Sequence, residues 1–361
     1  MKNSVYLPRF AERTFLGLLA VFNIALVFSV VVIAALGASS LAAKAQTQPS
    51  CTGQNLLEMM EGTDPEGYQR VLDAAADTVF GDHVFYRVEK PGTAPSFLFG
   101  TMHMTDERVL DMPQAAAEAL ANANIVAIEA TEILDETKAQ MTLLGRPDLT
   151  MFTGDQRLDD FMTVQQKTVI EAGLEQKGMK LALVNRMKPW LLSGMLALPA
   201  CETARKQAGA KILDVFIAEQ AQQGGKELVG LETIIEQLEA MDSIAMEDHI
   251  AGLADTLKFV DYMDDVIETM IIAYDEGDIG IVWPLLQNFK PDGFEADSNA
   301  ANGYTSFEEI MVNKRNQTMF DRSIPLLERG NAFIAVGALH LPGDRGLAQM
   351  YTDAGYTVTP M

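Results

Sequence analysis

The apolar residues of this chain follow two patterns, and their distribution divides the body of the sequence into three parts. Near both ends of the body, short apolar runs bounded by turn-forming residues predict strands. These predicted strands are Val84–Glu89, Ser96–Phe99, Asn124–Ala130, Ala332–Val336 and Tyr356–Thr359. Helical spacing of apolar residues predicts the neighbouring helices Gln114–Ala121, Ser306–Glu328 and Arg345–Ala354.

The middle of the chain is mostly helical in pattern, because its apolar residues recur three and four positions apart. The predicted helices are Leu158–Glu171, Trp190–Leu198, Thr203–Gln222 and, with interruptions, Thr233–Tyr274. One strand, Glu227–Leu231, follows a Gly-Gly pair, and the polar segment 290–301 predicts an exposed loop. We therefore expect an α/β fold with a mixed central sheet and a largely helical middle insertion.

The first 45 residues carry a separate pattern. Three basic residues precede a stretch without charge, residues 15–36, and Ala43-Lys44-Ala45 resembles a signal-peptidase site. We expect residues 1–45 to be a signal peptide and residues 46–361 to form one exported domain, periplasmic or extracellular. The apolar stretch is long for a signal peptide, so an uncleaved inner-membrane anchor over residues 15–36 is the alternative, and it would be the chain's only membrane contact.

Charge and cysteine content narrow the classes of function. The 361-residue chain has a formal net charge of −23, which argues against the basic surface that nucleic-acid binding requires. Its two cysteines, Cys51 and Cys201, both lie in the exported part, where oxidation is permitted and one pairing exists. We predict a disulfide between them, and the alternative is a pair of buried free thiols.

Two of the four histidines end a Gly-x-x-His motif that directly follows an apolar strand: Gly100 to His103, and Gly337 to His340. We expect each glycine to let the backbone leave its strand in a tight turn. The imidazole then lies at the carboxyl end of a strand, where open α/β sheets bind ligands. The two motifs thus predict a central sheet from two repeated strand–Gly-x-x-His–helix–strand units, with both histidines in one crevice.

Two glutamates also end apolar strands, Glu129 after residues 125–128 and Glu232 after residues 228–231. Two histidines and one carboxylate with an open position form a common hydrolytic metal site. We therefore predict that His103, His340 and Glu129 bind a metal and that Glu232 acts as general base. Two helix residues, Arg315 and Asn316, could hold a carboxylate or a developing oxyanion. The alternative is structural, with the glutamates paired to Arg315 or Lys226.

The order of these segments resembles a known family. FLFGTMHMTDERV, IVAIEA, LVGLETIIEQL, NKRNQTMF and FIAVGALHLPGDRGLAQMYTDAGYTV are similar to the motifs of the TraB/PrgY/GumN family, which is related to the Tiki metalloproteases. LPACETARKQAGAKILD resembles the second cysteine-containing segment of that family, which supports the predicted disulfide. The resemblance implies a peptidase-like site that uses a divalent metal of the manganese, cobalt or zinc class and acts on a peptide or protein.

Two other functions fit the same residues. Similar folds include erythromycin-esterase-like hydrolases and a haem-binding lipoprotein, so the fold alone does not define the reaction. The crevice could belong to a non-catalytic binding or signalling module that captures a peptide or a haem. It could also belong to a metal-free esterase in which a histidine acts as base.

Overall fold

The structure, a computed structural model, describes residues 51–291 and 306–361. The predicted signal peptide or anchor, and most of the predicted loop over residues 290–301, therefore lie outside the described residues. None of the helices in the described ranges is long and apolar enough to cross a membrane.

A six-stranded mixed sheet forms the centre of the fold, in the order β4-β3-β5-β2-β1-β6. The four neighbouring strands β4, β3, β5 and β2 are parallel, and β1 is antiparallel to both β2 and β6. The strands are β1 Phe85–Glu89, β2 Ser96–Thr101, β3 Ile125–Ile128, β4 Glu227–Gly230, β5 Ala332–Gly337 and β6 Thr357–Pro360. The predicted α/β fold with a mixed sheet is confirmed, and every predicted strand is present within a few residues of its expected bounds.

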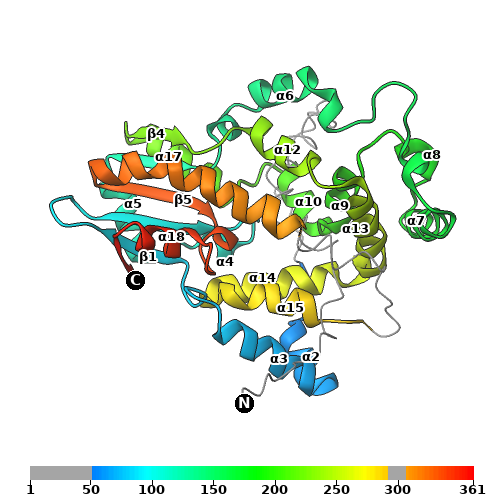
Figure 1. The fold of residues 1–361 in the computed structure, drawn as a ribbon, viewed down its shortest axis with the longest axis horizontal. Coiled ribbons are helices and arrows are strands. Elements are labelled where there is room, and N and C mark those ends of the chain that lie inside the picture. Colours follow the sequence, from blue (N-terminus) through cyan, green and yellow to red (C-terminus); the bar gives the residue numbers. More distant parts are fainter. Residues whose placement is uncertain (1–50, 292–305) are drawn as a thin grey trace, which may run out of the picture.

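The side chains of the inner strands point alternately to the two faces of the sheet and contribute to a hydrophobic core on each face. In β5 every residue is buried, as expected for a parallel strand covered on both sides. Ile334 and Val336 pack with apolar residues of α17 (Arg315–Arg329) and α18 (Leu347–Asp353). Phe333 and Ala335 belong to the larger core on the opposite face, with Leu213 and Ile217 of α11 (Leu213–Gln223). Figure 1 shows α17 lying along one face of the sheet.

The helical middle extends to one side of the sheet (Figure 1). Its helices are α6 Glu136–Gly145, α7 Val164–Gln176, α8 Leu181–Val184, α9 Pro189–Ala197, α10 Ala200–Gln207, α12 Ile234–Asp242, α13 Met246–Phe259, α14 Met263–Glu276 and α15 Val282–Asn288. The remaining helices are α2 Leu56–Thr63, α3 Pro65–Ala76, α4 Glu107–Leu110 and α5 Gln114–Asn122.

Two predicted helices are each divided in the structure. The segment predicted as one helix over Leu158–Glu171 is a short 3-10 turn followed by α7, because Thr163 caps α7 in a reciprocal pair with Gln166. The helix predicted over Thr203–Gln222 is divided into α10 and α11. Gly209 has a φ of +88°, a left-handed conformation that ends α10 just after Gln207.

The predicted disulfide is confirmed. Cys51 is bonded to Cys201 in α10 across 150 residues of sequence. It ties the first described residue to the helical middle of the fold, and the alternative of two free thiols is wrong.

Candidate metal-binding site

The four predicted metal-site residues follow the carboxyl ends of the four parallel strands. His103 follows β2, His340 follows β5, Glu129 follows β3 and Glu232 follows β4. All four are almost completely buried, with 2 to 4% of their surface exposed. The sheet therefore brings both histidines and both glutamates to one edge, as the sequence predicted.

Close packing explains the glycines of the two motifs. Neither has a positive φ, so neither is needed for a left-handed conformation, although a 3-10 turn, Ala338–His340, directly follows Gly337 as expected. A Cβ at Gly100 would lie 2.9 Å from the Cα of Ala338, inside the second motif. A Cβ at Gly337 would lie 3.1 Å from Oε1 of Glu129, which accepts a 2.7 Å hydrogen bond from the Gly337 amide. The missing side chains let the two motifs and Glu129 approach one another.

The orientation of His340 is determined by Asn316. The side-chain Nδ2 of Asn316 donates to the carbonyl of Arg345 at 2.8 Å, which leaves its Oδ1 to face Nδ1 of His340 at 2.6 Å. Nδ1 therefore carries the proton. Burial, with the nearby charge of Arg315, lowers the pKa of His340 to about 3, so the ring is neutral. Its Nε2 has a lone pair and lies 3.9 Å from Oε1 of Glu129.

His103 is oriented by a carboxylate that the sequence analysis missed. Nδ1 of His103 donates to Oδ2 of Asp214 at 2.8 Å, and Thr101 donates to Oδ1 of the same carboxylate at 2.8 Å. Burial alone would lower the pKa of His103, but the charges of Asp214 and Glu129 outweigh burial and raise it. Asp214 lies at the start of the apolar helix α11 and is 2% exposed. The sequence did contain a signal for this role, because an acidic residue within an apolar helix is unusual.

Arg315 connects the two glutamates. Its Nη2 lies 2.6 Å from Oε2 of Glu129 and 2.7 Å from Oε2 of Glu232, and its Nε also donates to Glu232. Burial would raise the pKa of Glu129, but the opposing effects, of which the charge of Arg315 is the largest, lower it to about 2. Arg315 is therefore a buried cation at the site, rather than the solvated residue usual on helices. Of the two alternative partners, Lys226 is excluded, since it donates to main-chain carbonyls.

The candidate donor atoms, imidazole nitrogens and a carboxylate oxygen, are of the types that bind divalent cations. His103 and His340 each use Nδ1 in an orienting hydrogen bond, as metal-binding histidines do, which leaves Nε2 of both rings and Oε1 of Glu129 as candidate ligands. Within residues 51–291 and 306–361, no three His, Cys, Asp or Glu side chains stand at coordination spacing. The 3.9 Å between His340 Nε2 and Glu129 Oε1 compares with about 3.4 Å for two ligands of one tetrahedral ion.

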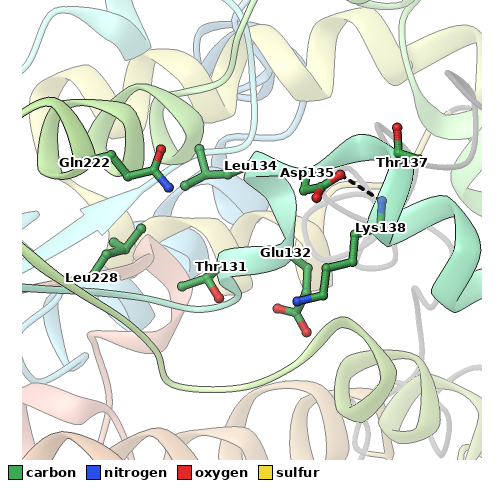
Figure 2. Close-up of a pocket in the computed structure, with 8 residues that line it drawn as sticks. All are labelled: Thr131, Glu132, Leu134, Asp135, Thr137, Lys138, Gln222 and Leu228. Atoms are coloured by element: carbon green, nitrogen blue, oxygen red, sulfur yellow. Dashed lines mark hydrogen bonds between the residues drawn. The ribbon is translucent and has the colours of Figure 1, made fainter.

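A cavity of about 610 Å³ lies beside the carboxyl end of β3 (Figure 2). Its lining begins two residues after Glu129 and is mainly polar: Thr131, Glu132, Leu134, Asp135, Thr137, Lys138, Gln222 and Leu228. Figure 2 shows these side chains coming from the segment after β3, from α11 and from β4. None of the residues that line this cavity is one of the predicted site residues, and the cavity is large enough for a side chain of a bound ligand.

The model of the TraB/PrgY/gumN family matches residues 84–360. The chain belongs to this family. It is 22% identical over 306 residues to metalloprotease TIKI2 of Danio rerio and 24% identical over 305 residues to metalloprotease TIKI1 of the same species. Each match covers 73% of this chain but only 58% and 60% of the two relatives, so the chain spans less than two thirds of their length. No solved structure matches the chain.

Proposed function

We propose that this TraB/PrgY/gumN family member is an exported, divalent-metal-dependent hydrolase with a peptidase-like site. The observation that carries the proposal is the pair of buried histidines, each held through Nδ1 by its own partner, beside a carboxylate at one sheet edge. The distant similarity to two proteins named metalloproteases supports it.

The proposed ligands are Nε2 of His103, Nε2 of His340 and the carboxylate of Glu129. A bound ion of the manganese, cobalt or zinc class would polarise a carbonyl and lower the pKa of a bound water. Asp214 and Asn316 serve as positioning residues, because each fixes the tautomer and the direction of one imidazole. Asn316 thus acts through His340, since both ends of its amide are engaged.

Glu232 is the proposed general base. Arg315 holds its carboxylate beside that of Glu129, and Gln237 donates to Oε2 of Glu129 at 3.0 Å. Two carboxylates bound to one guanidinium can occupy a small volume without the full repulsion between like charges. The base is therefore held next to the proposed ligand and has a fixed orientation toward it.

The proposed substrate is a peptide or protein, with one of its side chains in the cavity lined by Thr131 and Glu132. We further propose that residues 46–361 fold as one domain after export, which agrees with a disulfide in the described part of the chain.

Metal binding by the purified chain tests the proposal directly. We expect one cobalt or manganese ion per chain in the parent, and a loss of affinity of at least about 100-fold in His103→Ala and in His340→Ala. The control is His83→Ala, which alters a partly exposed histidine that is paired with Asp82. If His103→Ala binds cobalt as tightly as the parent, the ligand assignment is wrong.

The His103–Asp214 pair favours one second candidate, a metal-free hydrolase in which His103 is the base. Hydrolysis of a peptide or ester that persists after complete chelation would support it. An absorption band of bound haem in the purified protein would instead support the binding-module alternative.

A further inference from the structure

The N-terminal strap, residues 51–56, joins two helices of the middle region. At one end Cys51 is bonded to Cys201 of α10. At the other end, the Gln54 amide donates to Asp265 at 2.7 Å and the Leu56 amide donates to Thr269 at 2.8 Å, both on α14. Between them Gly53 lies so close to α14 that a Cβ there would overlap the backbone of residue 264. The strap therefore connects α10 with α14.

Helix α10 holds the His103 loop, residues 101–108, from one side. Glu202, next to the disulfide, accepts hydrogen bonds of 2.8 Å from both the amide and the hydroxyl of Thr105. Glu202 is fully buried. One turn further on, Lys206 donates to the carbonyl of His103 itself at 3.2 Å. The backbone of the predicted metal ligand is thus bound to the helix that carries Cys201.

Helix α14 holds the same loop from another side. Glu268 forms a two-pronged ion pair with Arg108, with distances of 2.7 and 2.8 Å. The hydroxyl of Tyr274 donates to the carbonyl of Gly100, the first residue of the Gly-x-x-His motif, at 2.8 Å. Both helices that the strap connects therefore contact the segment that positions His103.

The second motif lacks this connection. His340 is bound by Asn316 of α17, and the Gly337 amide is bound by Glu129. Among the described residues, no hydrogen bond or ion pair joins residues 337–345 to the strap, α10 or α14. The two halves of the site thus differ in their dependence on the disulfide.

We propose that the Cys51–Cys201 disulfide is a redox switch for the His103 half of the site. When it forms, two thiols lose two electrons and two protons to a disulfide oxidant such as glutathione disulfide, which leaves as two thiols. The closed strap connects α10 with α14 and orders the His103 loop. When the bond is reduced, the loop loosens while the His340 half keeps its structure. The effect on metal affinity rests on the proposed function, and the effect on loop order does not.

Hydrogen exchange of the full chain tests the loop, with the second motif as internal control. In Cys51→Ser and in Cys201→Ser, we expect amides of residues 101–108 to exchange at least about 10-fold faster than in the oxidised parent. Amides of residues 337–345 should exchange at the parent's rate. Equal acceleration in both segments would show a general loss of stability, and no change in either would show no coupling. Both results overturn the proposal.

Cobalt titration of the same proteins tests the effect on the site. We expect a loss of affinity of about 10- to 100-fold in both serine variants, as for the loss of other groups that orient metal ligands. Unchanged affinity, in a parent that binds cobalt, would overturn the metal part of the proposal. If the parent binds no cobalt in any state, the proposed function fails, and hydrogen exchange still decides whether the disulfide controls the loop.

Discussion

Gly100 of the first Gly-x-x-His motif lies directly against Ala338 of the second, with room for no side chain between them. The contact lies where β2 and β5, paired in the sheet, both end. It brings the start of the first motif against the turn that leads to His340.

Gly100→Ala should therefore disturb the site through packing. The added methyl group would lie 2.9 Å from a backbone atom, so we expect a loss of about 1 to 3 kcal/mol in unfolding free energy and weaker cobalt binding. Urea denaturation and cobalt titration measure the two effects. Gly62→Ala is the matched control, because a Cβ there meets no atom within 4 Å. Equal stability of the two variants would contradict the close-packing explanation.

Asp214→Asn should impair the site with little change in shape. The amide can no longer accept from His103 as a charged group, so the imidazole loses its defined tautomer and direction. We expect cobalt affinity to fall by about 10- to 100-fold, measured by titration. The control is Asp64→Asn, which alters another acidic residue that accepts from a backbone amide, that of Gly67 at the start of α3, outside both the strap and the site. Parent-like affinity in Asp214→Asn would remove Asp214 from the positioning role.

Arg315→Met should be among the most damaging changes in the chain. It removes the cation between Glu129 and Glu232 and leaves two buried carboxylates without their partner. The expected loss is about 3 to 5 kcal/mol in unfolding free energy. Arg329, on the same helix as Arg315, forms an exposed ion pair with Glu227 of β4. Arg329→Met removes this pair and should change the unfolding free energy by less than about 1 kcal/mol. Similar losses in the two variants would argue against the network at the site.

His249 gives the fold a defined dependence on pH. Its ring donates to the carbonyl of Met241, and burial lowers its pKa to about 4, below the ordinary value of 6.5. The unfolded chain then binds more protons than the folded chain between these two values, so acidification through this window lowers stability. The contribution of His249 falls by about 3 kcal/mol as the pH drops from about 6.5 to 4. Measuring the unfolding free energy of the parent and of His249→Gln at several pH values isolates the contribution of His249. Parallel pH profiles of the two proteins would refute this pH dependence.

Local patterns made the central part of this fold predictable. Apolar runs ending in Gly-x-x-His or in Glu are visible within a few residues, so β2, β3, β4 and β5 and the four residues after them could be read directly. The disulfide could be predicted because only one pairing exists. Each of these inferences needs only neighbouring residues or a count.

Relationships between distant residues could not be read in the same way. Asp214 reaches His103 across 111 residues, and no local pattern links a helix start to a strand end elsewhere. Arg315 is one of two partners that the sequence suggests for the glutamates, but spacing along an amphipathic helix does not decide between it and Lys226. The break at Thr163 depends on a side-chain cap that competes with an otherwise continuous apolar pattern.

The buried side chains around the histidines also have a charge balance of their own. Asp214, Glu129 and Glu232 are three carboxylates, and Arg315 is the guanidinium that contacts two of them. With both imidazoles neutral, as ligation requires, these four groups leave two negative charges in a space that excludes water. A doubly charged cation would bring this cluster to neutrality, whereas a singly or triply charged one would leave a net charge in the interior. The net charge of the buried groups would thus favour a divalent ion independently of the distances to its ligands.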